Sequence, residues 1–252
     1  MHATWVAPVI ALERLKRTLP KGAPVLDVGC GMGLFLALLE EAGFESIGLE
    51  VSRQSVAFLR SLGFRVAEGS VQSYATDWPM PQAITMFEVI EHLPDPVGFL
   101  KASRHRFPDA MLLLSTPSPR SWLLRLGLRL PWDYPPNHPL RWSEESLRTA
   151  LLAAGYRWVE VIYPTMGGRE MYDLLVGAIL VTKALRNRRG YMGQEAGGHG
   201  FWLRLARRFY WPLVSLQDGV LAPVVGALLT PLAWLGNRMG ASHSSFLVIA
   251  YP

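Results

Sequence analysis

Short apolar runs alternate with helical patterns over the first 163 residues of the chain. Runs of about four to eight apolar residues are typical of buried strands, and apolar residues that recur every three or four positions are typical of amphipathic helices. We predict strands at 24–28, 45–49, 64–67, 83–87, 110–115 and 156–163. We predict helices at 4–18, 33–42, 53–62, 96–106, 119–129 and 144–154. This alternation predicts an α/β fold with a parallel sheet and helices on both of its faces.

The alternation ends after residue 164. Residues 165–242 contain the segments "MYDLLVGAILVTKAL", "RNRRGYMGQEAGGHG", "FWLRLARRFYWPLV" and "GVLAPVVGALLTPLAWLG", of which the last carries no charge. The chain then returns to strand character in "SSFLVIAYP". We therefore predict one domain formed by 1–164 and 243–252, and a helical, basic and apolar segment at 165–242, which we call the insertion.

Three glycines at alternate positions follow the first predicted strand, in "PVLDVGCGMG". Such a turn lets the backbone approach a nucleotide-type ligand closely. A phosphate-binding P-loop needs a lysine and a Ser or Thr after its last glycine, and neither follows Gly33. A dinucleotide loop, G-x-G-x-x-G, would need glycine where Leu34 stands. The first of these readings fails and the second is weakened.

Two carboxylates flank this loop and narrow the choice of cofactor. Glu50 ends the next apolar run, "SIGLE", and an acid at this place typically accepts hydrogen bonds from both ribose hydroxyls. Asp27 places negative charge where a pyrophosphate would otherwise lie, which suits an ammonium or sulfonium group better than a polyanion. S-adenosylmethionine has a ribose, an ammonium and a sulfonium, so these residues favour it.

Two blocks resemble a known family. Residues 24–52 resemble the first two motifs of class I S-adenosylmethionine-dependent methyltransferases, and "ITMFEVIEHLPDP" at 84–96 resembles the fourth-strand motif of the ubiquinone-biosynthesis O-methyltransferase branch. The resemblance covers about 24–163 and the last ten residues. It implies a Rossmann-like seven-stranded methyltransferase sheet with helices on both faces, an antiparallel last pair of strands, and a helical hydrophobic insertion before the last strand.

The resemblance also implies the cofactor site, with S-adenosylmethionine held by the ends of the first, second and fourth strands and by the segment after the third. Ser70 stands where many relatives place an acid against the adenine, so backbone and Val71 are expected to hold that base. The expected cofactor-binding residues are Asp27, Gly29, Cys30, Gly31, Gly33, Glu50, Val51, Ser70, Val71, Phe87 and Glu88.

A hydroxyl acceptor must lose a proton, which calls for a His, Glu or Asp, or for a cation that lowers its pKa. We take His138, His92 and Glu91 as candidate catalytic residues, although a hydrogen bond that anchors the loop explains His92 equally well. Glu88, Glu91 and His92 could alternatively hold Mg²⁺, but three ligands are an unspecific set and the same residues can serve as cofactor wall and loop cap without a metal, so no metal is assigned. An Asn-Pro-Pro-aromatic motif after the fourth strand, a mark of amino-directed methyltransferases, is absent, which favours O-methylation.

Charge is distributed unevenly along the chain. Residues 1–173 hold 17 Lys and Arg against 18 Asp and Glu, net −1, while residues 174–252 hold 8 against 2, net +6, which together give the +5 of the whole chain. The basic residues are interleaved with long aliphatic runs that phosphate binding does not need, so we expect no nucleic-acid partner. Arginines beside tryptophan and tyrosine are typical of contact with anionic headgroups. We therefore predict peripheral membrane contact through the insertion.

A single membrane span is not expected. The uncharged run 219–236 has nearly the required length but contains Pro223 and Pro231. If the flanking strands pair in one sheet, the chain must also leave and return on one side. Helices lying in the interface or a re-entrant hairpin remain open, as do a soluble lid and an oligomer interface. The sequence predicts no oligomeric state.

The single cysteine excludes a disulfide framework and fits a reducing cytoplasm. The N-terminus has neither a basic start nor a small-residue cleavage site, so we expect no signal peptide and a cytoplasmic protein, peripheral on the inner face of the membrane. The leading hypothesis is an enzyme that methylates a hydroxyl of a hydrophobic or membrane-associated small molecule. The alternative is a non-catalytic cofactor-binding protein that recruits a partner to the membrane.

Overall fold

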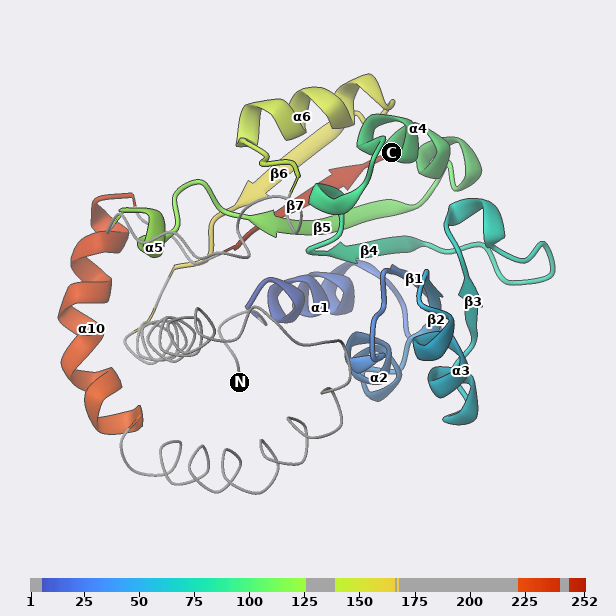
Figure 1. The fold of residues 1–252 in the computed structure, drawn as a ribbon, viewed down its shortest axis with the longest axis horizontal. Helices are drawn as coiled ribbons and strands as arrows, with labels where there is room; N and C mark the ends of the chain where they lie inside the picture. The colour runs from blue at the N-terminus through green and yellow to red at the C-terminus, as the bar shows by residue number, and fades with distance from the viewer. Residues whose placement is uncertain (1–5, 126–138, 166, 168–221, 241–244) are drawn as a thin grey trace, which may run out of the picture. The chain divides into compact units, whose positions relative to one another are not determined.

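The computed structural model describes residues 6–125, 139–165, 167, 222–240 and 245–252 (Figure 1). A seven-stranded sheet has the order β3-β2-β1-β4-β5-β7-β6. The strands are β1 Pro24–Val28, β2 Glu45–Glu50, β3 Val66–Glu68, β4 Ala83–Phe87, β5 Met111–Pro117, β6 Trp158–Ile162 and β7 Ser245–Tyr251. The first five pair in parallel, and β7 pairs antiparallel with both β5 and β6. The predicted methyltransferase-type sheet and its antiparallel last pair are confirmed.

The helices confirm most of the helical pattern. They are α1 Val6–Thr18, α2 Leu34–Glu41, α3 Arg53–Ser61, α4 Pro96–Arg106, α5 Trp122–Arg125, α6 Glu144–Ala153 and α10 Ala222–Arg238, with 3₁₀ turns η2 Val71–Ser73 and η3 Ile90–His92. The helix expected at 119–129 begins at Trp122, and its residues from 126 onward lie outside the described ranges. Ser143 caps α6 in a capping box with Ser146.

The third strand begins two residues later than its apolar pattern predicted. Gly63 has a φ of 90°, and the Phe64 N–H donates to the Leu59 carbonyl oxygen, so the turn that closes α3 extends through residue 64. β5 instead continues two residues beyond its predicted end, because Thr116 and Pro117 pair with the first residues of β7. Both differences arise from backbone hydrogen bonding that a hydrophobic pattern does not encode.

The two faces of the sheet are covered by different helices, as Figure 1 shows, with α1 and α2 on one side and α4 and α6 on the other. β5 displays the alternation directly. Leu112 and Leu114 belong to the core that includes α4 and α6 residues, whereas Met111 and Leu113 belong to the core with α1 and α2. Successive residues at the end of β5 therefore point to opposite faces of the sheet.

The insertion begins and ends on neighbouring strands. Ile162 at the end of β6 pairs with Leu247 near the start of β7. Since β6 runs parallel to β5, both ends of the insertion lie at the carboxyl edge of the parallel strands. The chain divides into two compact units, with boundaries between Pro164 and Thr165 and between Ala241 and Ser242. Most of the insertion lies outside the described residues, so its helical character stays a prediction apart from α10.

None of the helices in the described part of the chain combines the length and apolar character that a bilayer span needs.

Candidate active site

The three loop glycines all have positive φ, but a side chain would meet a different obstacle at each. A Cβ on Gly29 would lie 2.5 Å from a Val89 methyl, and one on Gly33 would lie 2.3 Å from a Leu59 methyl. A Cβ on Gly31 would meet only the Gly29 carbonyl oxygen, at 4.0 Å. Gly29 and Gly33 are thus required by packing as well as by backbone conformation, whereas Gly31 leaves open space for a ligand to approach the backbone.

Asp27 lies at the inner end of the loop and is buried. Its Oδ1 accepts a hydrogen bond of 2.7 Å from the Thr85 hydroxyl on β4. Burial, with a smaller contribution from the Glu50 charge, raises the pKa of Asp27 to about 7, against the opposing effect of Thr85. A cation that binds beside this carboxyl would favour its ionised form. This agrees with the expected ammonium or sulfonium ligand.

Glu50 ends β2 and holds the loop by both of its oxygens. Oε2 accepts from the Gly31 N–H at 2.8 Å, and Oε1 accepts from the Ser52 N–H at 2.9 Å. Each carboxylate oxygen can accept a further hydrogen bond, so the side chain can also accept from ribose hydroxyls. The residues at the ends of β1 and β2 therefore fit an S-adenosylmethionine site: an open glycine, a buried acid and a fixed acceptor.

Cys30 is buried inside the loop and packs toward Gly48 of β2, where a Cβ would lie 2.8 Å from its Sγ. Burial, with the charges of Asp27 and Glu50, raises the pKa of the Cys30 thiol to about 12. A protonated, enclosed thiol matches a small packing residue. Its expected contact with the cofactor stays a prediction.

The expected adenine contacts differ in their exposure. Val51 follows Glu50 and is 79% exposed, so its side chain is available to a planar base. Val71 is 1% exposed and belongs to the main core, which leaves its backbone to contact a ligand. Ser70 precedes η2, and its hydroxyl donates to the Gln72 side-chain oxygen. The assignment of Ser70 and Val71 to the adenine stays a prediction.

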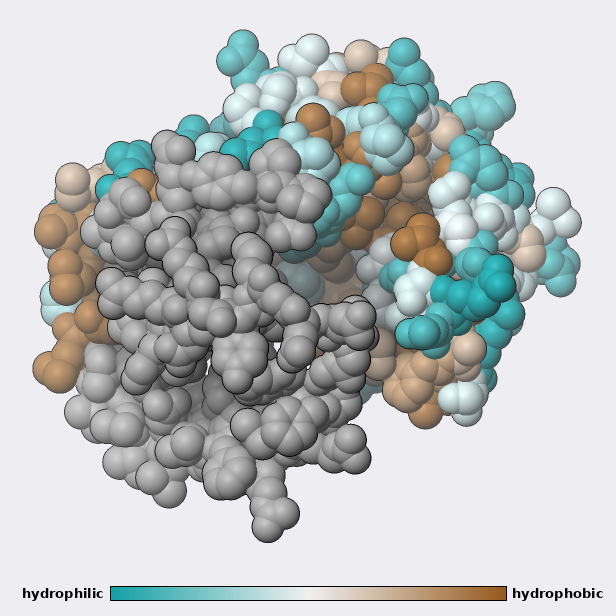
Figure 2. Space-filling model, viewed as in Figure 1, coloured by the Kyte–Doolittle hydropathy of each residue, from teal (hydrophilic) through white to brown (hydrophobic). Residues whose placement is uncertain are grey.

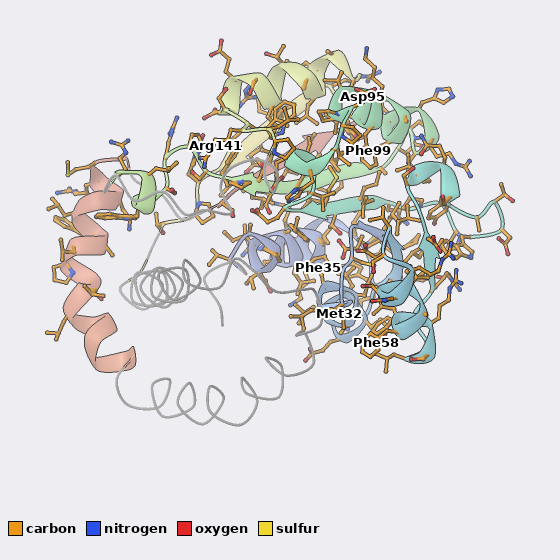
Figure 3. All side chains as sticks on the ribbon, viewed as in Figure 1. Met32, Phe35, Phe58, Asp95, Phe99 and Arg141 are labelled. Carbon is orange, nitrogen blue, oxygen red and sulfur yellow. The ribbon has the colours of Figure 1, made fainter. Side chains whose placement is uncertain are left out.

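The end of β4 carries Phe87 and Glu88. The Phe87 ring makes an edge-to-face contact with Phe35 at the start of α2, with centroids 4.8 Å apart. Figure 3 shows Phe35 together with Met32 of the glycine loop on one side of the sheet, and Asp95, the N-cap of α4, with Phe99 of α4 on the other. Glu88 is the single non-glycine residue with positive φ in the described part of the chain, at 56°. Backbone strain of this kind is frequent at functional sites.

Glu91 and His92 lie in η3, directly after β4, but differ completely in exposure. His92 is exposed, and its backbone N–H donates to the Val89 carbonyl oxygen. Glu91 is 0% exposed; its Oε2 accepts from the Thr116 hydroxyl, and its Oε1 has no hydrogen-bond partner among the described residues. Burial, reinforced by the Glu88 charge, raises the pKa of Glu91 to about 8. This burial favours a positioning role for Glu91 over direct contact with an acceptor.

The E-x-x-E-H residues do not form one ligand cluster. Glu88 Oε1 accepts from the Ser115 hydroxyl at 2.7 Å, while Glu91 accepts from that of Thr116. Ser115 and Thr116 are consecutive in β5, so these hydroxyls point to opposite faces of the sheet. Among the described residues, no group of three His, Cys, Asp or Glu side chains is placed to hold a metal ion.

Sequence reasoning missed the hydroxyl partners of the three buried or half-buried acids, which are Thr85 for Asp27, Ser115 for Glu88 and Thr116 for Glu91. The sequence pattern that could have indicated these partners is a Ser or Thr within an apolar strand, when a neighbouring strand ends near an Asp or Glu. His138, the other candidate base, lies outside the described residues. Its catalytic role stays a prediction.

Comparison with known proteins gives the same fold and cofactor. A family model described as a methyltransferase domain matches residues 7–161, more than half of the chain. The ubiquinone biosynthesis O-methyltransferase of Leptothrix cholodnii is 30% identical over 130 residues, which cover 46% of this chain and 55% of that protein. The chain spans about half the length of the curated relatives it matches.

Solved structures share the fold at low sequence identity. An S-adenosylmethionine-dependent methyltransferase from Archaeoglobus fulgidus has a TM-score of 0.55 and 18% identity, covering 97% of this chain and 94% of that one. A phosphoethanolamine N-methyltransferase from Haemonchus contortus, solved with S-adenosyl-L-methionine, has a TM-score of 0.57 and 15% identity, covering 98% and 52%. These similarities concern architecture, and they leave the acceptor atom undetermined.

Proposed function

The chain belongs to the methyltransferase family, whose cofactor is S-adenosylmethionine, and we propose that it transfers the methyl group to a hydroxyl oxygen of a hydrophobic small molecule. When bound, S-adenosylmethionine supplies an electrophilic methyl group on a sulfonium. The protein's task is to align the acceptor oxygen with that methyl, exclude water and take up the hydroxyl proton.

The observation that carries this proposal is the contact between the cofactor loop and the turn that bears His92. Val89, the residue before η3, packs so closely on Gly29 that no side chain fits between them. The exposed side chain of His92 belongs to η3, and Val89, the residue before η3, contacts the glycine loop. In this arrangement His92 accepts the acceptor's proton, with His138 as the other candidate, and the buried Glu91 holds the turn through Thr116.

Oxygen as the acceptor atom is supported by the relatives and by the sequence. The curated relatives that match 41–46% of the chain, such as those of Leptothrix cholodnii and Idiomarina loihiensis, are named for O-methylation in ubiquinone biosynthesis. The motif of amino-directed enzymes is absent after β4. A relative named for a step in the formation of a lipid-soluble quinone also supports a hydrophobic acceptor.

We further propose a cytoplasmic protein that reaches its acceptor at a membrane surface through the insertion. The support is the charge of the chain, net +6 over 174–252 against −1 over 1–173, together with long apolar runs in the same segment. A sheet domain that buries its own core has no need of such runs.

A matched pair of acceptors tests the acceptor atom. The full chain is incubated with methyl-labelled S-adenosylmethionine and either a phenol or an aniline that carries the same long alkyl chain. We expect label in the phenol alone. Label in the aniline alone would overturn the O-methyltransferase proposal, and cofactor binding without transfer to either would favour the non-catalytic alternative.

A further inference from the structure

Helix α10, Ala222–Arg238, exposes its large apolar side chains. Leu228, Leu232, Leu235 and Met239, just beyond the helix end, are 72%, 53%, 50% and 67% exposed. Their spacing of four, three and four residues places them in one line along the helix, which we call the apolar stripe. Figure 2 shows the corresponding brown surface along α10, at the left of the view.

The small residues of the same helix are enclosed instead. Ala233 is 1% exposed and lies on the side of α10 away from the apolar stripe, and Gly236, at the edge of the stripe beside Leu232, is buried. A helix of a water-soluble domain normally turns its large apolar residues inward. α10 has the reverse orientation, so its apolar stripe requires an apolar partner outside the described residues.

Charge indicates which partner fits. α10 contains no Asp or Glu, and the Arg238 guanidinium lies over the ring of Trp234, 4.6 Å from its centroid, with Trp234 57% exposed. Paired arginine and tryptophan beside an apolar stripe are typical of the boundary between lipid headgroups and acyl chains. In a symmetric dimer the same surface would meet itself and bring Arg238 toward its own copy. An anionic bilayer offers the opposite charge.

We propose that α10 lies in the plane of an anionic bilayer, with the apolar stripe at the acyl boundary and Arg238 at the headgroups. The helix is too short to span the membrane. This inference rests on the proposed membrane attachment and assigns it to named residues. It does not depend on the acceptor or on methyl transfer.

Flotation of the full chain with vesicles tests it. Vesicles are made of phosphatidylcholine alone or of equal parts phosphatidylcholine and phosphatidylglycerol. We expect the wild-type chain to float with the anionic vesicles, and the double variant Leu232→Glu, Leu235→Glu to lose at least about tenfold in partitioning. The control variant, Leu62→Glu with Leu152→Glu, replaces two leucines that are 58% and 49% exposed on the sheet domain, so it adds the same charge. It should float like the wild type.

Calorimetric binding of S-adenosylmethionine and circular dichroism accompany each variant, because unchanged values show that the sheet domain is folded. Equal flotation of the stripe variant and the wild type would overturn the proposal. A second result would also overturn it: the wild-type chain floats with neither kind of vesicle and sediments as a dimer, while the stripe variant sediments as a monomer. In that case a second copy of the chain would cover the stripe. Loss of cofactor binding with flotation intact would affect the proposed enzyme and leave the membrane contact standing.

Discussion

The carboxyl edge of the sheet has two halves that are held in different ways. The cofactor half, at the ends of β1 and β2, is held mainly through the backbone of one loop: Glu50 accepts from the Gly31 and Ser52 N–H groups, and the loop glycines turn within a few residues. Asp27 in this half also accepts from Thr85 on β4. The acceptor half, our name for the ends of β4, β5 and β6, where we propose that the acceptor binds, is held by contacts between side chains of separate segments. Glu91 meets Thr116, and the Arg120 guanidinium lies 4.2 Å from the ring centroid of Tyr163.

This difference explains why the cofactor can be named and the acceptor cannot. The glycine loop and the acids at the ends of β1 and β2 lie in two short sequence blocks, and together they resemble the cofactor motifs of a known family. A surface assembled from several segments changes with each of them. In this chain Tyr163, after β6, stacks on Phe246 of β7, with centroids 5.3 Å apart, so residues far apart in the sequence also meet at this edge.

The largest expected effect concerns the acceptor half. If His92 takes the acceptor's proton, His92→Ala should lower kcat by about 10²–10⁴-fold and leave S-adenosylmethionine affinity nearly unchanged. His105→Ala is the matched control, since His105 is also exposed and lies on α4. Steady-state kinetics and calorimetry measure the two effects. Full activity in His92→Ala would transfer the role to His138, and full activity in the double variant would remove histidine from the mechanism.

A second prediction concerns Glu50 in the cofactor half. Glu50→Ala removes the acceptor for ribose and also the acceptors for the Gly31 and Ser52 N–H groups, so cofactor binding should weaken by about 2–4 kcal/mol. Glu50→Gln keeps one acceptor oxygen and should fall between the wild type and Glu50→Ala. Calorimetry gives the affinities. Unchanged affinity in Glu50→Ala would remove the ribose assignment.

The sequence was sufficient for the strands, the glycine loop and the positions of its two acids because each shows in a short stretch of residues, whereas the Thr85 partner of Asp27, 58 positions away, was missed. Gly29, Gly31 and Gly33 require positive φ, and that requirement is visible in the glycines themselves. The burial of Glu91 was not predictable, because the polar pattern "EVIEH" gives no sign that its second acid lies under the turn. Its partner Thr116 is 25 positions away and reaches it only once β4 and β5 pair.

A third prediction follows from the pKa of Asp27, which burial raises from 3.8 to about 7. Below pH 7 the free protein holds a proton on Asp27, and a cationic cofactor favours its release. S-adenosylmethionine affinity should therefore rise as pH increases toward 7, by at most about tenfold per unit, and then level off. The ionisable neighbours are Glu50 and Cys30.

Calorimetry in two buffers of different ionisation enthalpy measures this proton release. Thr85→Val removes the hydroxyl that stabilises the ionised Asp27, so it should move the pH midpoint upward. A heat of binding that is the same in both buffers at pH 6 would show that Asp27 releases no proton when the cofactor binds, which would overturn this prediction.

The smallest expected effect is on stability and distinguishes a positioning Glu91 from an acceptor-facing one. Its pKa is raised from 4.5 to about 8, so the folded protein holds a proton that the unfolded chain releases. Wild-type stability should fall as pH rises from about 5 to 8, since unfolding then releases that proton, and should change little above this range. Glu91→Gln has no proton to release, so its Tm should exceed that of the wild type by roughly 2–5 °C at pH 8 and by less at pH 5.

Glu41→Gln, at an exposed position on α2, should give no such pH-dependent difference. A Tm difference between Glu91→Gln and the wild type that is constant from pH 5 to 8 would mean that Glu91 is ionised in the fold, as an acid open to the acceptor would be.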